Sequence, residues 1–211
     1  MTVATHGRLP WPERDDLDGD GRAVYDAIVG GPRASDAATS PIIAPDGRLE
    51  GPFNAMLVSP AVGGALQSLG SAIRYGSSLA DRDRELAILE VAAHHRSDFE
   101  WFAHERLANA AGLEAATLEA IRSRRHPEGL DAGADAVWTA VRALLERGDL
   151  DDEEYASLVA ARGEPATVEL VVLVGYYQTL ALMLRTFRVP VPAAADGAII
   201  DWSASNREVK S

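Results

Sequence analysis

Cysteine is absent from this chain of 211 residues. The absence excludes disulfide bonds, thiolate nucleophiles, CxxC redox centres and thiolate metal sites, and it fits a reducing, cytoplasmic location. Basic residues are also few, since 20 lysines and arginines stand against 32 aspartates and glutamates, for a net charge of −12. A nucleic acid or an anionic membrane surface needs a basic footprint on its partner, so we expect neither as a partner.

Long apolar runs are scarce as well. The N-terminal sequence MTVATHGRLPWPERDD has no apolar run and does not predict a secretory signal. The longest apolar stretch, Val168 to Leu184, contains Glu169 and Gln178 and is shorter than the ~20 residues that span a bilayer. We therefore expect this stretch to be a buried helix of a soluble protein.

Helical periodicity dominates the rest of the chain. Residues 1–51 are expected to form an N-terminal arm with one short helix, RAVYDAIV, which ends at Gly30. Residues 52–190 are expected to form a helical domain, and residues 191–211 an extended tail that wraps on a partner subunit. We predict no strand, so the fold class is all-α.

The helices of this domain are marked by caps, breakers and apolar spacing. Ser59 and Pro60 are expected to begin one helix, whose buried face repeats at helical spacing as Val62, Leu66, Leu69 and Ile73. The next helix carries the apolar stripe Leu86, Leu89 and Ala93. The further predicted helices cover about 81–95, 98–111, 114–122, 137–147, 151–163 and 165–187.

The most informative stretch is the predicted helical hairpin from Asp81 to Gly112. Glu100 and His104 are four residues apart and therefore lie on one face of one helix, and antiparallel packing would bring Glu85 beside His104. An imidazole beside carboxylates is suited to moving protons near neutral pH. A structural interpretation stays open, because Glu100 also completes a capping box with Ser97 and Glu85 would suit a solvated surface.

Other polar residues have weaker patterns. His94 and His95 do not have the spacing of a known metal site, and we expect one of them to stabilise a helix C-terminus instead. The acidic run Asp16 to Gly21 mimics the start of a calcium loop, but position twelve is Ala27, so a helix-capping turn is the better interpretation. We expect no metal.

A second group of candidates would bind a substrate. Glu169 lies in an apolar helix, where it either has a functional role or is stabilised by the helix N-terminus. Tyr177 is placed to donate a hydrogen bond, and Asn54 and Arg74 are polar groups suited to a carboxylate. No nucleophile elbow, phosphate-binding glycine loop or dinucleotide fingerprint occurs in the sequence.

Four segments resemble the carboxymuconolactone decarboxylase family, whose superfamily also contains the AhpD-type alkylhydroperoxidases. They are RELAILEVA, the string EWFAH that ends at His104, LANAAGL and VELVVLVGYY, and the similarity covers roughly residues 52–190. The resemblance implies an AhpD-like all-α fold around a central helical hairpin. It also implies a homo-oligomer, as a dimer, trimer or hexamer, with sites near subunit contacts.

The resemblance also assigns residues. In the peroxidase branch a CxxC pair reduces peroxide, and its two cysteine positions fall here on Ser97 and Glu100, so thiol peroxidase chemistry is excluded. The branch's glutamate falls on Glu85 and its second histidine falls on Phe99. The resulting hypothesis is a cofactor-independent, decarboxylase-like lyase for a small carboxylated lactone or keto acid. Its expected catalytic residues are Glu85, Glu100 and His104: His104 would donate the proton, Glu100 would orient it and Glu85 would complete the relay. Its expected substrate-binding residues are Tyr177, Asn54, Arg74 and Trp101.

Two alternatives use the same residues. The first is a non-catalytic binding or accessory protein, in which the three polar side chains only hold the hairpin together. The second is a different proton-transfer enzyme, such as an isomerase or a lactone hydrolase. The sequence does not distinguish these alternatives from the lyase.

Overall fold

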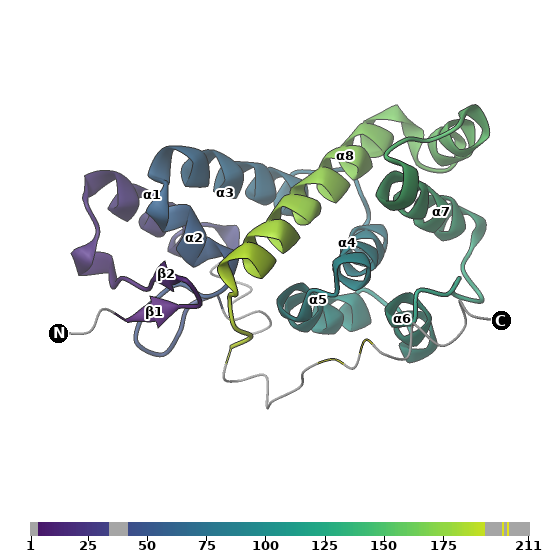
Figure 1. Cartoon of the computed structure of the whole chain (residues 1–211). Coiled ribbons are helices and arrows are strands. Elements are labelled where there is room, and N and C mark those ends of the chain that lie inside the picture. The colour runs from purple at the N-terminus through teal and green to yellow at the C-terminus, as the bar shows by residue number, and fades with distance from the viewer. Residues whose placement is uncertain (1–3, 34–41, 193–199, 201, 203–211) are drawn as a thin grey trace. The chain divides into compact units, whose positions relative to one another are not determined.

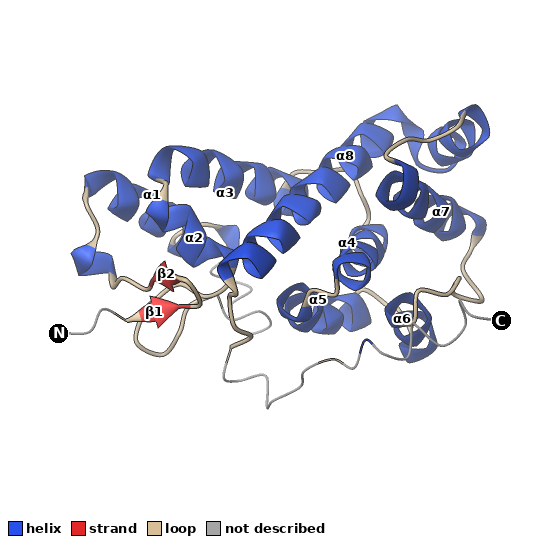
Figure 2. Cartoon of the chain, viewed as in Figure 1, coloured by secondary structure: helices blue, strands red, loops and turns tan. Residues whose placement is uncertain are grey.

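The computed structural model describes residues 4–33, 42–192, 200 and 202, and most of these residues are helical (Figures 1 and 2). The all-α prediction is therefore confirmed. The chain forms two compact units. The first contains Met1–Gly76 and Leu182–Gly197, and the second contains Ser77–Ala181 and Ala198–Ser211. This division groups the helices of residues 52–75 with the N-terminal arm.

The first unit begins with a short hairpin that the sequence analysis did not predict. Strands β1 (Thr5–His6) and β2 (Leu9–Pro10) pair antiparallel, with Thr5 opposite Pro10 and His6 opposite Leu9. A turn at Gly7, whose φ is 65°, joins them. The strands are only two residues long, which is below the length at which alternating hydrophobicity can be recognised.

Buried polar contacts attach this hairpin to the rest of the first unit. The Gly51 N–H donates to Nε2 of the buried His6 at 3.1 Å, and the His6 ring stacks on Trp11. Trp11 Nε1 in turn donates to the Leu49 carbonyl oxygen at 2.8 Å. Burial lowers the pKa of His6, so the imidazole stays neutral and remains an acceptor at neutral pH.

The helices of the first unit are a 3-10 turn, η1 (Arg14–Asp16), and α1 (Gly19–Val29), α2 (Pro52–Val58) and α3 (Pro60–Tyr75). Asp18 caps α1, and its side chain accepts from the Gly21 N–H at 2.8 Å. The capping-turn interpretation of the acidic run is therefore confirmed. Helix α3 begins at Pro60 with Ser59 at its N-cap position, as predicted, although the Ser59 side chain makes no cap hydrogen bond.

The apolar face that was predicted for α3 is not buried at most of its positions. Val62 and Leu69 are 67% and 41% exposed, whereas Ile73 is buried. The buried side of α3 carries Gly63, Gln67, Gly70 and Ile73. The reason is a close backbone contact, because a Cβ atom at Gly63 would lie 2.0 Å from the Met56 carbonyl oxygen of α2. Glycine on this side of α3 allows α2 to approach this closely, so the apolar residues Val62 and Leu69 lie on the surface instead.

The second unit is built around α4 (Asp81–His95), which packs against α5 (Asp98–Ala110), α6 (Ala115–Arg122) and α7 (Ala132–Arg147). Leu86, Leu89 and Ala93 are fully buried, as predicted. Arg96, with a left-handed φ of 53°, ends α4, and the Ser97 side chain accepts from the Glu100 N–H to begin α5. The central hairpin is therefore confirmed.

Helix α8 (Asp152–Phe187) is interrupted at Gly163, whose φ of 83° and ψ of 164° are not helical. Two consecutive helices meet there, as Gly163 and Pro165 predicted. Among the described residues, α8 is the one helix whose length and composition would suffice to cross a membrane. Half of its most apolar window is buried in the protein, and a core helix of a soluble protein meets the same criteria.

Candidate active site

Glu85 of α4 and both Glu100 and His104 of α5 come together inside the second unit. His104 Nδ1 lies 2.7 Å from Glu85 Oε2, and His104 Nε2 lies 3.7 Å from Glu100 Oε2. All three side chains are at most 6% exposed. The hairpin therefore brings an imidazole between two buried carboxylates, which is the arrangement that the spacing predicted.

The short contact defines the tautomer of His104 on chemical grounds. An ionised carboxylate only accepts hydrogen bonds, so His104 Nδ1 donates its proton to Glu85. Nε2 is then the nitrogen that exchanges a proton with another group. Its distance to Glu100 is beyond that of a hydrogen bond, so this nitrogen is not held by the second carboxylate.

This geometry reverses the roles that the sequence suggested for the two glutamates. Glu100 was expected to orient the imidazole and Glu85 to complete the relay. The hydrogen bond instead joins His104 to Glu85, while Glu100 faces the opposite ring nitrogen. The reason lies in the helix geometry, because residues four apart on α5 share a face without their polar tips having to meet.

Of the two predicted aromatic residues, Tyr177 contacts this site and Trp101 contacts a different residue. The Tyr177 ring of α8 meets the His104 ring edge-on, with centroids 5.3 Å apart. The Trp101 ring meets Trp202 edge-on at 5.7 Å, and Trp202 Nε1 donates to Asp98 Oδ1 at 2.8 Å. Tyr177 is thus beside the imidazole, whereas Trp101 packs on a residue near the C-terminus. The rest of the predicted tail lies largely outside the described residues.

Asn54 and Arg74 belong to the first unit. Asn54 is buried, and its Nδ2 donates to the Pro10 carbonyl oxygen at 2.9 Å, which connects α2 to β2. The Arg74 guanidinium lies over the ring of its neighbour Tyr75 at 5.7 Å. The geometry of the candidate site therefore comes from Glu85, Glu100, His104 and Tyr177, and the substrate-binding roles of Asn54, Arg74 and Trp101 stay predictions.

Glu169, the remaining candidate in α8, is hydrogen-bonded to Ser78. Its Oε2 accepts from the Ser78 backbone N–H at 2.8 Å and from the Ser78 hydroxyl at 2.7 Å. These bonds connect α8 to the segment that precedes α4. They account for a carboxylate in an apolar helix without a catalytic role.

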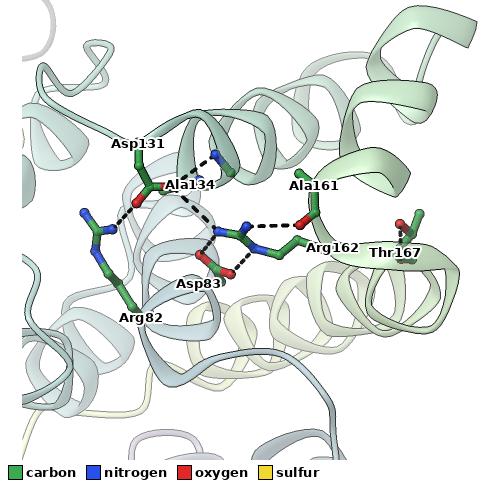
Figure 3. Close-up of polar contacts among 9 residues, drawn as sticks. Arg82, Asp83, Asp131, Ala134, Ala161, Arg162 and Thr167 are labelled. Carbon is green, nitrogen blue, oxygen red and sulfur yellow. Dashed lines mark hydrogen bonds and ion pairs between the residues drawn. The ribbon is translucent and has the colours of Figure 1, made fainter.

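Two further buried carboxylates of α4 were missed by the sequence analysis. Asp83 accepts two hydrogen bonds from Arg162, at 2.5 and 3.2 Å (Figure 3). Glu90 accepts from Trp138 Nε1 at 2.5 Å. Burial raises the pKa of Glu90 to about 7, against the opposing effect of Arg142. The string DRDRE gave no sign of Asp83, because alternating charges at a helix start normally suggest a solvated surface.

No metal cluster is formed within the described part of the chain, where no three His, Cys, Asp or Glu side chains are arranged to hold an ion. His94 lies in the last turn of α4, with its Nδ1 3.5 Å from Arg124 Nη2. Burial, followed by the charge of Arg124, lowers the pKa of His94. A neutral His94 does not favourably complement the helix C-terminus, so the predicted cationic role is not supported for this residue.

Comparison with known proteins shows which family and which solved structures this core is similar to. The model of the carboxymuconolactone decarboxylase family matches residues 60–146. No curated protein matches the chain. Among solved structures, the chain is similar to an AhpD-core, peroxidase-related protein from Ralstonia eutropha, with 11% identity, a TM-score of 0.70, and coverage of 92% of this chain and 96% of the other.

Two further structures show the same fold. A peroxidase-related protein from Silicibacter sp. has 12% identity and a TM-score of 0.69, with 95% of this chain and 99% of the other covered. The debrominase Bmp8 in complex with 2,3,4-tribromopyrrole has 12% identity and a TM-score of 0.67, with 93% and 96% covered. At these identities the likeness concerns the fold alone, and it agrees with the AhpD-like architecture that was predicted.

Proposed function

We propose, from the match of residues 60–146 to the carboxymuconolactone decarboxylase family, that this chain is a cofactor-independent lyase. Its substrate is a small carboxylated lactone or keto acid. The observation that carries this proposal is the buried contact of 2.7 Å between His104 Nδ1 and Glu85 Oε2. This contact orients an imidazole whose other nitrogen remains able to transfer a proton.

The proposed reaction breaks the bond between the substrate carbon and its carboxylate. The electron pair of that bond moves into a neighbouring carbonyl to form an enolate, and CO₂ leaves. The imidazolium of His104 then delivers a proton from Nε2 to the carbon, and solvent returns a proton to the ring. Glu85 stabilises the imidazolium through Nδ1, and burial strengthens every electrostatic contact in this site.

The other side chains have supporting roles in this proposal. Glu100 Oε2 lies 3.7 Å from Nε2, on the side of the ring from which the proton is transferred. Tyr177, edge-on to the ring, is placed to donate a hydrogen bond to the substrate carbonyl as the enolate forms. Trp101 supplies an apolar wall on the same helix. The absence of cysteine excludes the thiol chemistry of the peroxidase branch.

Release of CO₂ from carboxymuconolactone and from simple β-keto acids tests the proposal. We expect turnover by the wild type, and a loss of about 10²-fold in His104→Gln, because general acid catalysis contributes at least this much. His126→Gln is the matched control, since His126 is half exposed and pairs with Asp135 away from these residues. The helical circular dichroism signal should be the same in all three proteins. Full activity of His104→Gln would refute the assignment.

The alternative function is a non-catalytic accessory protein of the same fold. The low exposure of all three side chains favours it, because a purely structural cluster would also be buried. The double variant Glu85→Gln/His104→Gln distinguishes the two. A structural cluster predicts a lower melting temperature, whereas a catalytic site predicts equal or higher stability. A wild type that turns over none of the compounds would favour the accessory role.

We also propose that the protein is a cytoplasmic homo-oligomer. The exposed apolar side chains of α3, Val62 and Leu69, support this, because residues 51–80 contain a single charged residue, Arg74. Copies that each carry a charge of −12 repel one another and can associate only through such a neutral surface. In sedimentation velocity we expect an oligomer that Val62→Glu/Leu69→Glu dissociates. A monomeric wild type at micromolar concentration would contradict the proposal.

A further inference from the structure

The Glu85 carboxylate faces two different cationic or potentially cationic groups. Its Oε2 accepts from His104 Nδ1 at 2.7 Å, and its Oε1 lies 3.6 Å from Arg84 Nε. The two oxygens are therefore divided between the imidazole of α5 and the guanidinium of the preceding residue on α4. Arg84, unlike the exposed Asp81 of the same turn, has a side chain that is only 11% exposed.

The rest of the Arg84 guanidinium is fixed from the surface side. Its Nη2 donates to Asp81 Oδ1 at 2.8 Å, one turn earlier on the same helix. Its Nε is buried and has no hydrogen-bond partner among the described residues. A buried donor without a partner costs free energy, so a neutral side chain of similar length would fill this position at less cost. The role of Arg84 therefore lies in its positive charge.

The positive charge of Arg84 acts on the groups around Glu85. Glu85 faces Arg84 from its own helix and His104 from α5. The His104 ring in turn faces Glu100 through its other nitrogen and meets the Tyr177 ring of α8 edge-on. Two carboxylates and a single imidazole in a buried place favour protonation of one carboxylate. A protonated Glu85 would no longer be the acceptor that fixes His104 Nδ1. An arginine is permanently charged, so it opposes this protonation at every physiological pH.

We propose that Arg84 is a positioning residue of this site, which keeps the Glu85 carboxylate charged and turned so that its Oε2 faces His104 Nδ1. Arg84 acts through Glu85 and does not touch the reacting atoms. Its importance for turnover rests on the proposed function, whereas its effect on Glu85 does not. In an active enzyme, loss of Arg84 would lower kcat with little change in KM.

The side-chain carboxyl ¹³C signal of Glu85 tests this proposal without a substrate. The signal is assigned with Glu85→Gln and followed by NMR against pH in the full-length chain. In Arg84→Met we expect the titration midpoint of Glu85 to rise by at least about one pH unit, because a neighbouring cation lowers a carboxyl pKa by roughly this amount or more. Arg84→Lys, which retains the charge, should keep the midpoint close to that of the wild type.

Arg82→Met is the matched control. Arg82 is a neighbouring arginine of α4, whose Nη1 pairs with Asp131 Oδ2 at 2.6 Å, and its loss should leave the Glu85 midpoint unchanged. An unchanged midpoint in a folded Arg84→Met protein would overturn the proposal. If Arg84→Met does not fold, Arg84→Gln gives the same test, and a raised midpoint in Arg84→Lys would also overturn the role of charge.

The failures of the two proposals are distinguishable. An unchanged Glu85 midpoint rejects the role of Arg84 and leaves proton transfer by His104 intact. Full decarboxylase activity of His104→Gln rejects the catalytic function and leaves a shifted Glu85 midpoint valid as an electrostatic result.

Discussion

Replacement of Arg162 by methionine is expected to lower the free energy of unfolding by about 3–5 kcal/mol at neutral pH, which is the usual cost of breaking a buried ion pair. Arg162 donates through Nε and Nη2 to the two oxygens of Asp83, as Figure 3 shows. Asp83 is 2% exposed. Without the guanidinium, its carboxylate would stay in the interior with no cation to compensate it.

The surroundings of Arg162 make rearrangement difficult. Its Nη1 donates to the Ala161 carbonyl oxygen, and its Nη2 lies 3.9 Å from Asp131, the residue that caps α7 (Figure 3). A Cβ atom at Gly133 in the first turn of α7 would lie 1.9 Å from Arg162 Nη1. The guanidinium therefore fills the space that glycine leaves, and it connects α8 to α4 just before the break at Gly163.

Urea unfolding of the full-length chain measures the effect of Arg162→Met. Arg147→Met is the matched control, because Arg147 is half exposed and its ion pair with Glu154 should contribute at most about 1 kcal/mol. Replacing both Asp83 and Arg162 by leucine should recover much of the loss, since no unpaired buried charge would remain. Equal unfolding midpoints for Arg162→Met and the wild type would show that the pair does not stabilise the fold.

The second large effect concerns Glu90 and pH. Burial is the main cause that raises its pKa to about 7 from 4.5, and Arg142 and the Trp138 hydrogen bond oppose it. Between these two values the folded protein keeps the proton while the unfolded chain releases it. The stability from Glu90 is therefore present below pH 4.5 and is lost as the pH rises towards 7, by roughly 3 kcal/mol in all.

Glu90→Gln should remove this dependence, because glutamine resembles the protonated carboxyl and still accepts from Trp138. We expect the variant to be more stable than the wild type by about 3 kcal/mol at pH 8 and nearly equal to it at pH 4. Thermal unfolding at both pH values measures this difference. Glu153→Gln, a change at an exposed glutamate of α8 that does not act on Glu90, is the control. Parallel pH profiles for Glu90→Gln and the wild type would contradict the expectation.

The helical organisation could be predicted closely from the sequence, because its signals are local. Gly76, Gly148, Gly163 and Pro165 end or begin helices for backbone reasons that need no tertiary contact. The i, i+4 spacing of Glu100 and His104 likewise determines that they share a face. The two-residue strands were missed, since a pattern so short has no periodicity.

The distribution of charge and apolar surface could not be predicted in the same way. Asp83 and Glu85 are buried although they lie in the charged string DRDRE, and Glu90 is buried among apolar neighbours. Each has a partner far away in the sequence: Arg162, His104 and Trp138. The inward-facing side of α3 was predicted from its apolar residues, but the close approach of the Met56 backbone requires glycine on that side. Both outcomes depend on which helix packs against which.

The sequence by itself determined that this chain is helical, that it lacks thiol chemistry, and that Glu100 and His104 lie on one face of a helix beside a hairpin turn. Those properties follow from composition and from local backbone preferences. The tertiary structure decided that Glu85, and not Glu100, holds the imidazole, and that Arg84 faces the other oxygen of the same carboxylate. Hydrogen bonds and ion pairs of this kind depend on distances of a few tenths of an ångström between neighbouring elements, which only the packing of α4 against α5 defines.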